Sequence, residues 1–312
     1  MPREPRPFSI WLPRPLWIGL ATVLLVAVAI GLGIGVPIYR QQAMIREVEE
    51  LGGAVETEPR GFEKFAPWVS NERLKSFGNV VSIELQGTEA DDATMHRIGR
   101  LAGIKRLRLD NTDVTDAGLV YLEKITSLSA LSLSGTRVTD TGLAILTGLE
   151  SIEELDLSTT EISDAGLTHV GNLSSLLKLN LGRQVVRSDG SRFGHVSDSG
   201  VAQLGRLKRL RSLELRYTAV TSEALKSLHD LSDLQELDLS GTRVRDDGIE
   251  ALGALTSLEK LWIDNTSVTD AGLRHLLPLK SLKLVSAVFT SVSARGVRDL
   301  RSERPDLQID TR

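Results

Sequence analysis

A segment of 24 residues that recurs along the chain constrains its fold more than any other feature. The most regular copy, Leu128 to Ser151, reads LSALSLSGTRVTDTGLAILTGLES. Successive copies are 24 residues apart, except for one step of 34 residues between Leu176 and Leu210. A fixed period of this length predicts a solenoid, in which each unit packs only against its neighbours. The first apolar residues of the nine units are Val80, Ile104, Leu128, Ile152, Leu176, Leu210, Leu234, Leu258 and Leu282.

The apolar residues of one unit change their spacing halfway along it. Leu131 and Leu133 are two residues apart, so both side chains point to the same side of an extended strand. Leu143, Leu146 and Leu149 follow three residues apart, which is typical of the buried face of a helix. Each unit therefore predicts one short strand and one short helix around a shared leucine core.

A threonine follows the strand of nearly every unit, as Thr136 does in the regular copy. Its hydroxyl is expected to satisfy backbone groups at the bend, and a stack of such residues would form an internal ladder. Its counterparts are Thr88, Thr112, Thr160, Thr218, Thr242, Thr266 and Thr290.

An aspartate, Asp140 in the regular copy, comes just before the helical part of the unit. We expect its carboxylate to cap the free amides of that helix, which explains the series without a metal ion. Its counterparts are Asp92, Asp116, Asp164, Asp198, Asp246 and Asp270, with Ser222 and Ala294 in the remaining units.

The pattern resembles the leucine-rich repeat family, in particular its T-D-x-G-L subtype. Such repeats occur in bacterial membrane-anchored proteins and in the repeat portion of F-box proteins. The resemblance covers about residues 80–300. It implies an α/β fold, a right-handed leucine-rich-repeat solenoid with a parallel concave sheet and short convex helices. An apolar run replaces the F-box segment before the repeats, which argues against a ubiquitin-ligase adaptor.

A long uncharged run near the amino terminus predicts a membrane anchor. Leu16 to Val36 contains no charged residue over 21 positions, and as a helix it would span roughly 31 Å, about the thickness of a bilayer core. We therefore expect an N-terminal transmembrane helix over residues 16–38, after a tail over residues 1–15. A cleaved signal peptide is the alternative, because the run contains Ala27-Val28-Ala29, a small-x-small site.

The charges that flank the run predict a single-pass topology. Basic residues precede the run and a mixed segment follows it, so the tail is expected in the cytoplasm and the repeats outside it. Gly31 and Gly35 have the small-xxx-small spacing that lets two membrane helices approach closely. A weak homodimer through these two glycines is therefore a further expectation.

The segments on either side of the repeats predict caps. Residues 39–60 read as a juxtamembrane helix, which Gly52-Gly53 would end, followed by a linker. The aromatic-rich residues 61–79 read as an amino-terminal cap, because the first repeat has no neighbour on one side. Residues 301–312 read as a carboxy-terminal cap, in which Leu307 and Ile309 could add a closing strand.

The outward positions of the strands are the first place where function is expected. Trp262 is a large aromatic among small polar residues, which indicates an interface anchor, and the acids around it favour a cationic partner. The alternative is that strands need polar outward residues only for solubility. The predicted partner-binding residues of this row are Asp156, Glu214, Arg216, Asp238, Lys260, Trp262 and Asp264, and Asp110 lies in the same row.

The second place is an insertion of ten residues in the fifth unit, within residues 183–195. It interrupts the turn after the strand, so it should project from the rim of the solenoid. Arg187, Arg192, Phe193 and His195 give it a basic patch with one aromatic, and we predict that they bind a partner. A tolerated surface loop is the alternative.

Composition excludes several classes of function. The net charge of -4 offers no basic face for nucleic acid, and the absence of cysteine excludes thiolate metal sites and cysteine nucleophiles. The five histidines are scattered and no catalytic motif surrounds them, so we expect neither an enzyme nor a cofactor. The sequence predicts a membrane-anchored module that recognises a protein or glycan outside the cytoplasm. A structural spacer or a self-assembling envelope scaffold is the alternative.

Overall fold

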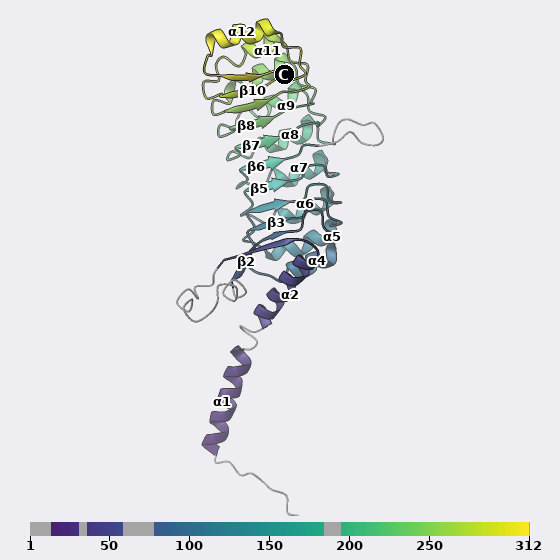
Figure 1. Cartoon of the computed structure of the whole chain (residues 1–312), viewed down its shortest axis with the longest axis vertical. Coiled ribbons are helices and arrows are strands. Elements are labelled where there is room, and N and C mark those ends of the chain that lie inside the picture. Colours follow the sequence, from purple (N-terminus) through teal and green to yellow (C-terminus); the bar gives the residue numbers. More distant parts are fainter. Residues whose placement is uncertain (1–13, 31–35, 59–77, 184–194, 312) are drawn as a thin grey trace, which may run out of the picture. The chain divides into compact units, whose positions relative to one another are not determined.

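The computed structural model of the chain describes residues 14–30, 36–58, 78–183 and 195–311 (Figure 1). It divides into two compact units, Met1–Arg46 and Glu47–Arg312, which are described separately below. Several predicted features lie outside the described residues: most of the tail over residues 1–15, the pair Gly31 and Gly35, nearly all of the cap over residues 61–79, and Arg187, Arg192 and Phe193 of the insertion.

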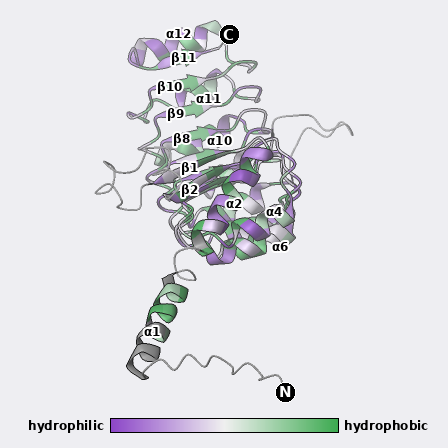
Figure 2. Cartoon of the chain, turned by 60° about the horizontal axis from the view of Figure 1, so that its bottom comes forward, coloured by the Kyte–Doolittle hydropathy of each residue, from purple (hydrophilic) through white to green (hydrophobic). Residues whose placement is uncertain are grey.

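The first unit holds helix α1, Arg14–Ile30, which is 17 residues long. The sequence predicts a longer helix over residues 16–38, but α1 ends at Ile30 and helix α2 begins at Val36. Val23, Leu24 and Leu25 of α1 are exposed, and Figure 2 shows the apolar colouring of this segment. Within the described residues, none of the helices combines the length and the apolar character that crossing a membrane requires.

Helix α2, Val36–Glu50, ends at the predicted glycine pair. Gly52 adopts a left-handed backbone with φ of 85°, and the amide of Gly53 donates to the Val48 carbonyl at 2.8 Å, which closes the last turn. The chain then forms strand β1, Ala54–Glu58, where the sequence predicts a linker. The difference has a physical reason, because β1 pairs antiparallel with β2 and satisfies backbone groups that the first repeat strand would leave at an open edge.

Within the described residues, the strands form one sheet of eleven, arranged in chain order. It is mixed rather than purely parallel, since β1 is antiparallel and every later pair is parallel. In the regular unit, Leu131 of β4 lies between Leu107 and Leu155 of the neighbouring strands. The remaining strands are β2 Asn79–Glu84, β3 Arg106–Arg108, β4 Ala130–Ser132, β5 Glu154–Asp156, β6 Lys178–Asn180, β7 Ser212–Glu214, β8 Glu236–Asp238, β9 Lys260–Trp262, β10 Leu284–Ser286 and β11 Gln308–Asp310.

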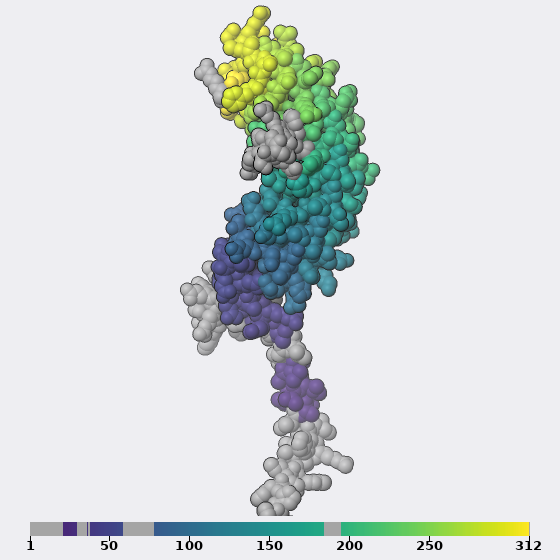
Figure 3. Space-filling model, turned by 90° about the vertical axis from the view of Figure 1, so that its right-hand side faces the viewer, coloured from purple at the N-terminus to yellow at the C-terminus, as the bar shows by residue number. Residues whose placement is uncertain are grey.

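A short helix follows each of the strands β2 to β10, and in Figure 1 these helices stack beside the strands. Figure 3 shows that the second unit curves along its length. The helices are α4 Asp92–Ile98, α5 Asp116–Leu119, α6 Asp140–Leu146, α7 Asp164–Val170, α8 Asp198–Leu204, α9 Ser222–Lys226, α10 Asp246–Ala251, α11 Asp270–Arg274 and α12 Ala294–Glu303, with 3-10 segments η3 Val120–Lys124 and η4 Leu252–Ala254.

The core lies between strands and helices and consists of stacked aliphatic side chains. Leu131 and Leu133 from the strand side are at most 2% exposed, as are Leu143, Leu146 and Leu149 from the helix side. The change of spacing within one repeat thus places five leucines per unit into one buried layer. Because the next unit repeats the same layer, the core is continuous along the solenoid.

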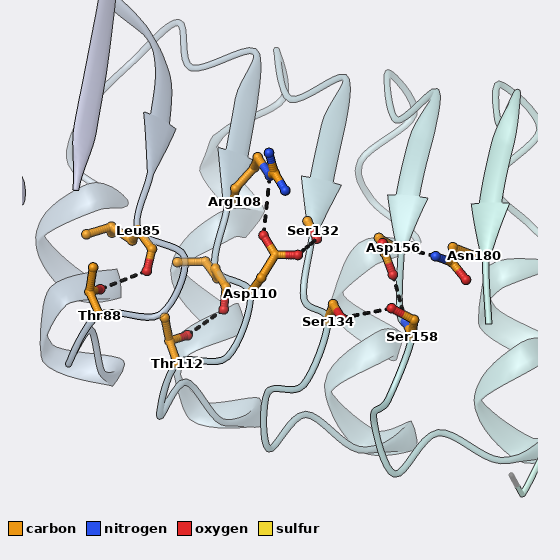
Figure 4. Close-up of polar contacts among 11 residues, drawn as sticks. Leu85, Thr88, Arg108, Asp110, Thr112, Ser132, Ser134, Asp156, Ser158 and Asn180 are labelled. Carbon is orange, nitrogen blue, oxygen red and sulfur yellow. Dashed lines mark hydrogen bonds and ion pairs between the residues drawn. The ribbon is translucent and has the colours of Figure 1, made fainter. Parts of the chain in front are cut away.

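The repeated threonine plays the predicted structural role. The Thr136 hydroxyl donates to the carbonyl of Leu133 at 2.6 Å, and the Thr112 hydroxyl makes the same bond to Leu109 at 2.7 Å (Figure 4). Both threonines are buried. Each hydroxyl therefore satisfies a carbonyl of its own unit where the strand ends, and the stacked residues line the interior of the bend.

The repeated aspartate does not cap its own helix, so that prediction is wrong. The cap of α6 is Thr139, whose hydroxyl accepts from the Thr141 amide. Asp140 instead accepts two hydrogen bonds from the next unit, from the Ser163 amide at 2.8 Å and the Ser163 hydroxyl at 2.5 Å. The carboxylate of Asp140 is free to contact Ser163, the capping residue of the next helix, because the hydroxyl of Thr139 already caps α6.

We call this arrangement the aspartate bridge: a carboxylate of one unit accepts from the amide and hydroxyl of the capping residue of the next. It recurs from Asp92 to Thr115, Asp116 to Thr139, Asp164 to Ser197, Asp198 to Thr221, Asp246 to Thr269 and Asp270 to Ser293. It is interrupted once, where Ser222 replaces the aspartate and Arg245 replaces the hydroxyl cap. There the Arg245 amide donates to the Ser222 hydroxyl at 3.1 Å, and that hydroxyl donates to Asp247 Oδ1 at 2.6 Å. The side chain of Arg245 does not cap the helix.

The bridge also accounts for the glycine of the T-D-x-G-L pattern. A Cβ atom at Gly166 would lie within 3.0 Å of Asp140 Oδ1, closer than real Cβ atoms approach their neighbours. Gly142 stands in the same relation to Asp116. The glycine is therefore required by the close approach of the preceding unit's carboxylate, in an ordinary helical backbone conformation.

The last unit ends on a closing strand and a buried arginine. The strand suggested by Leu307 and Ile309 is β11, which pairs parallel with β10. Arg304, in the predicted cap over residues 301–312, is only 5% exposed although it is charged. Its Nη1 and Nη2 atoms donate to the carbonyls of Leu279 and Leu282 at 2.9 and 2.8 Å, so it fills backbone acceptors that a further repeat would otherwise satisfy.

Candidate functional site on the sheet face

The outward face of the sheet holds the predicted partner-binding residues of the strands. Lys260 and Trp262 are the first and last residues of β9, and Glu214 is the last residue of β7. Asp156 and Asp238 occupy the same last position in β5 and β8, while Arg216 and Asp264 come two residues after their strands. All lie an even number of residues apart within their units, so they share one face.

A hollow of about 250 Å³ opens on this face between β7 and β9. We call it the β7–β9 hollow, and its lining is Ser212, Leu213, Glu214, Arg216, Glu236, Asp238 and Trp262. The structure thus brings together four of the predicted residues. Asp156, Lys260 and Asp264 do not line the hollow, and Glu236, which does, is absent from the prediction.

Most charges around the hollow are paired between adjacent strands. Lys260 Nζ lies 2.7 Å from Glu236 Oε1, and Arg216 Nε lies 3.3 Å from Asp238 Oδ2. The pairing explains why the sequence does not reveal Glu236: its partner is 24 residues away, on the next strand. Within the described residues, the Glu214 carboxylate forms neither a hydrogen bond nor an ion pair.

Burial raises the pKa of Glu214 above its ordinary value of 4.5. The charge of Asp238 raises this pKa further, and Asp156 and Glu236 add to it, while Arg216 opposes it. The folded chain therefore binds more protons than the unfolded chain between 4.5 and the raised pKa, and stability falls as pH rises through that window. Above its raised pKa the charged Glu214 carboxylate is a destabilising group, and groups with perturbed pKa values cluster at functional sites.

Three of the acids predicted to bind a partner instead accept hydrogen bonds within the protein, in the turns at the strand ends. Asp238 is 7% exposed, and its Oδ1 accepts from the Ser240 amide at 2.8 Å. Asp156 accepts from the Ser158 amide at 2.8 Å and from Asn180 Nδ2 at 3.2 Å (Figure 4). Asp264 likewise accepts from the Ser286 hydroxyl and the Val288 amide, at 2.6 and 2.7 Å. These carboxylates hold the turns after the strands in place.

A second hollow of about 330 Å³ lies on the same face between β3 and β7. Two of its cations are paired across strands: Lys178 Nζ lies 2.6 Å from Glu154 Oε1, and Arg106 Nη2 lies 2.5 Å from Glu56 Oε2. Arg108 is paired within its own unit, 3.3 Å from Asp110. The second hollow shares Glu214 with the β7–β9 hollow. Arg106 and Arg108 are not among the predicted residues, although their outward positions in β3 could have shown them.

The described ends of the insertion lie beside an acid of the preceding unit. His195 Nε2 is 3.2 Å from Glu161 Oε2, and an Arg183 guanidinium nitrogen is 3.8 Å from the same carboxylate. Arg187, Arg192 and Phe193 lie outside the described residues, so the basic patch of the insertion stays a prediction.

Phe289 is an exposed aromatic that the sequence reading missed. It is 84% exposed and adopts a left-handed backbone with φ of 57°, in the turn after β10. Gly135 and Gly241 take the equivalent left-handed position in other units, where glycine has no steric penalty. Tyr217 also takes this position, with φ of 56°, so two of the described units place an aromatic residue there. Comparison of the turn positions between units would have revealed both.

Within the described ranges, no three or more His, Cys, Asp or Glu residues are placed to hold a metal ion. His96 stacks on Tyr121 with ring centroids 4.8 Å apart, and the ring of His229 contacts the Lys226 carbonyl and Asp230. The described site therefore offers a binding surface of paired charges and one half-exposed tryptophan.

Comparisons with known proteins agree with this architecture. A family model described as a leucine rich repeat matches residues 231–253. The chain is similar to the crystal structure of internalin C2 from Listeria monocytogenes, with 24% identity, a TM-score of 0.51 and coverage of 71% of this chain and 84% of that one. A second internalin of that organism is 16% identical, with a TM-score of 0.38 and coverage of 74% and 84%. No curated protein matches the chain.

The repeat match and the likeness to internalin C2 support a leucine-rich-repeat fold for the described part of the chain. Neither distinguishes the T-D-x-G-L subtype from other leucine-rich repeats. The subtype therefore stays a prediction from the sequence.

Proposed function

We propose that this chain is a non-catalytic recognition module that binds a protein partner on the outward face of its sheet. The observation that carries the proposal is the β7–β9 hollow, which half-buried Trp262 lines together with Glu214 and Arg216 from the far side of β8. Binding energy in protein interfaces concentrates in a few aromatic and arginine residues that lie in pockets. The repeat match and the internalin-like fold support the same class of function.

A protein is favoured over a glycan because the hollow is rich in acids, which attract a cationic partner. Glu214, Glu236 and Asp238 line it against the single cation Arg216. Capture of a glycan would contradict this part of the proposal. Self-association of the chain without any captured partner would favour the alternative, a structural spacer or scaffold.

Replacing Trp262 with alanine tests the proposal. The full chain is crosslinked in intact cells and recovered, and the attached partner is measured. Loss of an interface anchor costs about 2 kcal/mol or more, so we expect roughly a tenfold or larger reduction in the recovered partner. Tyr121→Ala is the matched control, because Tyr121 is an exposed aromatic of the 3-10 segment η3, outside the sheet face. Equal recovery by wild type and Trp262→Ala would contradict the proposal.

We infer further that residues 16–38 anchor the chain in a membrane, with the tail in the cytoplasm and the repeats outside it. Support comes from the uncharged run Leu16 to Val36 and from the exposure of Val23 and Leu24 in α1, since large apolar side chains are unfavourable in water. We expect the full chain to stay in the membrane fraction at alkaline pH. Protease added to cells or spheroplasts should digest the repeats, and digestion only after the cytoplasm is opened would contradict this orientation.

A further inference from the structure

The β7–β9 hollow has an excess of negative charge that the protein itself does not balance. Of its acids, Glu236 is paired with Lys260 and Asp238 with Arg216. Glu214 is left without a hydrogen bond or an ion pair within the described residues. A cation supplied by a partner would pair with Glu214 and remove the repulsion between it and Asp238.

The groups around Glu214 come from several strands. Asp238 and Glu236 lie on β8, Asp156 on β5, and Arg216 follows β7 itself. On β6 the nearest charged residue is Lys178, which pairs with Glu154, and Asn180 accepts and donates hydrogen bonds without charge. The cations near Glu214 already form ion pairs with other carboxylates: Arg216 with Asp238, Lys260 with Glu236 and Lys178 with Glu154. The charge around Glu214 that remains unpaired is therefore negative.

The size and wall of the hollow indicate what kind of cation fits. Its 250 Å³ lies below the roughly 300 Å³ at which small-molecule pockets begin, so it suits one side chain of a larger partner. Trp262 forms part of the wall and is half-buried. A guanidinium is planar, stacks on an indole face and donates several hydrogen bonds in a fixed fork, whereas an ammonium is a compact and strongly hydrated charge.

We propose that the β7–β9 hollow binds an arginine side chain from a basic segment of the partner, with the guanidinium stacked on Trp262 and paired with Glu214. This inference rests on the proposed function and adds the chemistry of the partner to it. The sheet face then binds arginine side chains of the partner, and Glu214 and Trp262 determine its preference for arginine.

The test uses the full chain in detergent, with its four tryptophans labelled with 5-fluorotryptophan. The Trp262 fluorine signal is assigned by its loss in Trp262→Phe. The probe is acetyl-Gly-Gly-Arg-Gly-Gly-amide, and the control peptide carries citrulline, which keeps the shape of arginine without its charge. We expect saturable displacement of the Trp262 signal by the arginine peptide and none by the citrulline peptide over the same concentrations.

Glu214→Gln is expected to weaken arginine-peptide binding by roughly threefold to tenfold. Glu150→Gln makes the same charge change at an exposed residue outside the strands and should leave binding unchanged. Because glutamine removes a carboxylate whose charge destabilises the fold, Glu214→Gln should unfold at or above the wild-type temperature at pH 7, which excludes misfolding as the cause. For wild type, lowering the pH through the raised pKa of Glu214 should weaken peptide binding, since the neutral acid no longer attracts the cation.

Three outcomes would overturn the inference: equal binding of the citrulline peptide, equal binding of a lysine peptide, or unchanged binding in Glu214→Gln. The proposed function is tested separately. If recovery of the cellular partner requires Trp262 but the arginine peptide does not bind, the proposed recognition function is kept and the proposed arginine specificity is rejected. If the peptide binds but no partner is recovered from cells, the proposed function fails instead.

Discussion

Replacing Gly166 with alanine is expected to destabilise the chain by about 1–3 kcal/mol, although alanine normally favours a helix. Gly166 is buried in the first turn of α7, and its added Cβ would lie within 3.0 Å of Asp140 Oδ1. That oxygen is held in place by the Ser163 amide, so it cannot move away without losing a hydrogen bond. Urea unfolding of the full chain, followed by circular dichroism, measures the loss.

A double-mutant cycle isolates the cause. Asp140→Ala alone should cost about 2–4 kcal/mol, because two hydrogen bonds to a charged group are lost and the Ser163 amide is left unsatisfied. In the Asp140→Ala background, Gly166→Ala should cost clearly less than in wild type, since the added Cβ then meets the Ile162 and Leu143 side chains, at 3.0 and 3.1 Å, and gains helix propensity. Gly253→Ala is the control, because a Cβ there meets nothing within 4 Å. Simple additivity of the two changes would show that the carboxylate is not the obstacle.

Replacing Arg304 with alanine is expected to destabilise the last unit by about 2–4 kcal/mol. The change removes one donor from the Leu279 carbonyl, which keeps the Leu282 amide at 3.1 Å, and the side-chain donor from the Leu282 carbonyl. An unsatisfied buried backbone group costs about 1–3 kcal/mol. The effect should be local, because units of a solenoid contact only their neighbours. Hydrogen exchange should therefore accelerate in β10 and β11 and stay unchanged in β3 and β4.

Arg298→Ala is the matched control for this prediction. Arg298 is an exposed arginine on the same helix, α12, so its loss removes a charge without opening the core. Arg304→Lys should recover only part of the stability, since one ammonium cannot reproduce the two-pronged contact with both carbonyls. Exchange in β10 and β11 that matches wild type in Arg304→Ala would contradict the role of Arg304 as a cap.

The repeat made the core predictable, because periodicity depends on residues within one unit. The spacing of Leu131, Leu143 and Leu146 defines a strand side and a helix side, and all three are buried. The aspartate was misread because its function depends on the next unit: Asp140 and Ser163 are 23 residues apart, and only the stack brings them together. Strand β1 was also missed, because five residues with alternating burial do not stand out from a linker.

The candidate site was only partly predictable for a similar reason. Trp262 stands out in the sequence by its residue type alone. The state of the acids around it depends on which cation lies across the strand, so the pairing of Glu236 and the isolation of Glu214 required the sheet register. The structural role of Asp238 could not be predicted from the sequence either, because its carboxylate accepts a hydrogen bond from the Ser240 amide in the turn after β8.

The interruption of the aspartate bridge has a consequence for how binding and folding are coupled. Between the units of α9 and α10 the carboxylate bridge is replaced by two hydrogen bonds of the Ser222 hydroxyl, which accepts from the Arg245 amide and donates to Asp247 Oδ1. The β7–β9 hollow takes its lining from the strands of these same two units and of the next. A partner seated there contacts both sides of this joint, so its binding free energy adds to the cohesion of the solenoid at the one described joint that lacks the aspartate bridge.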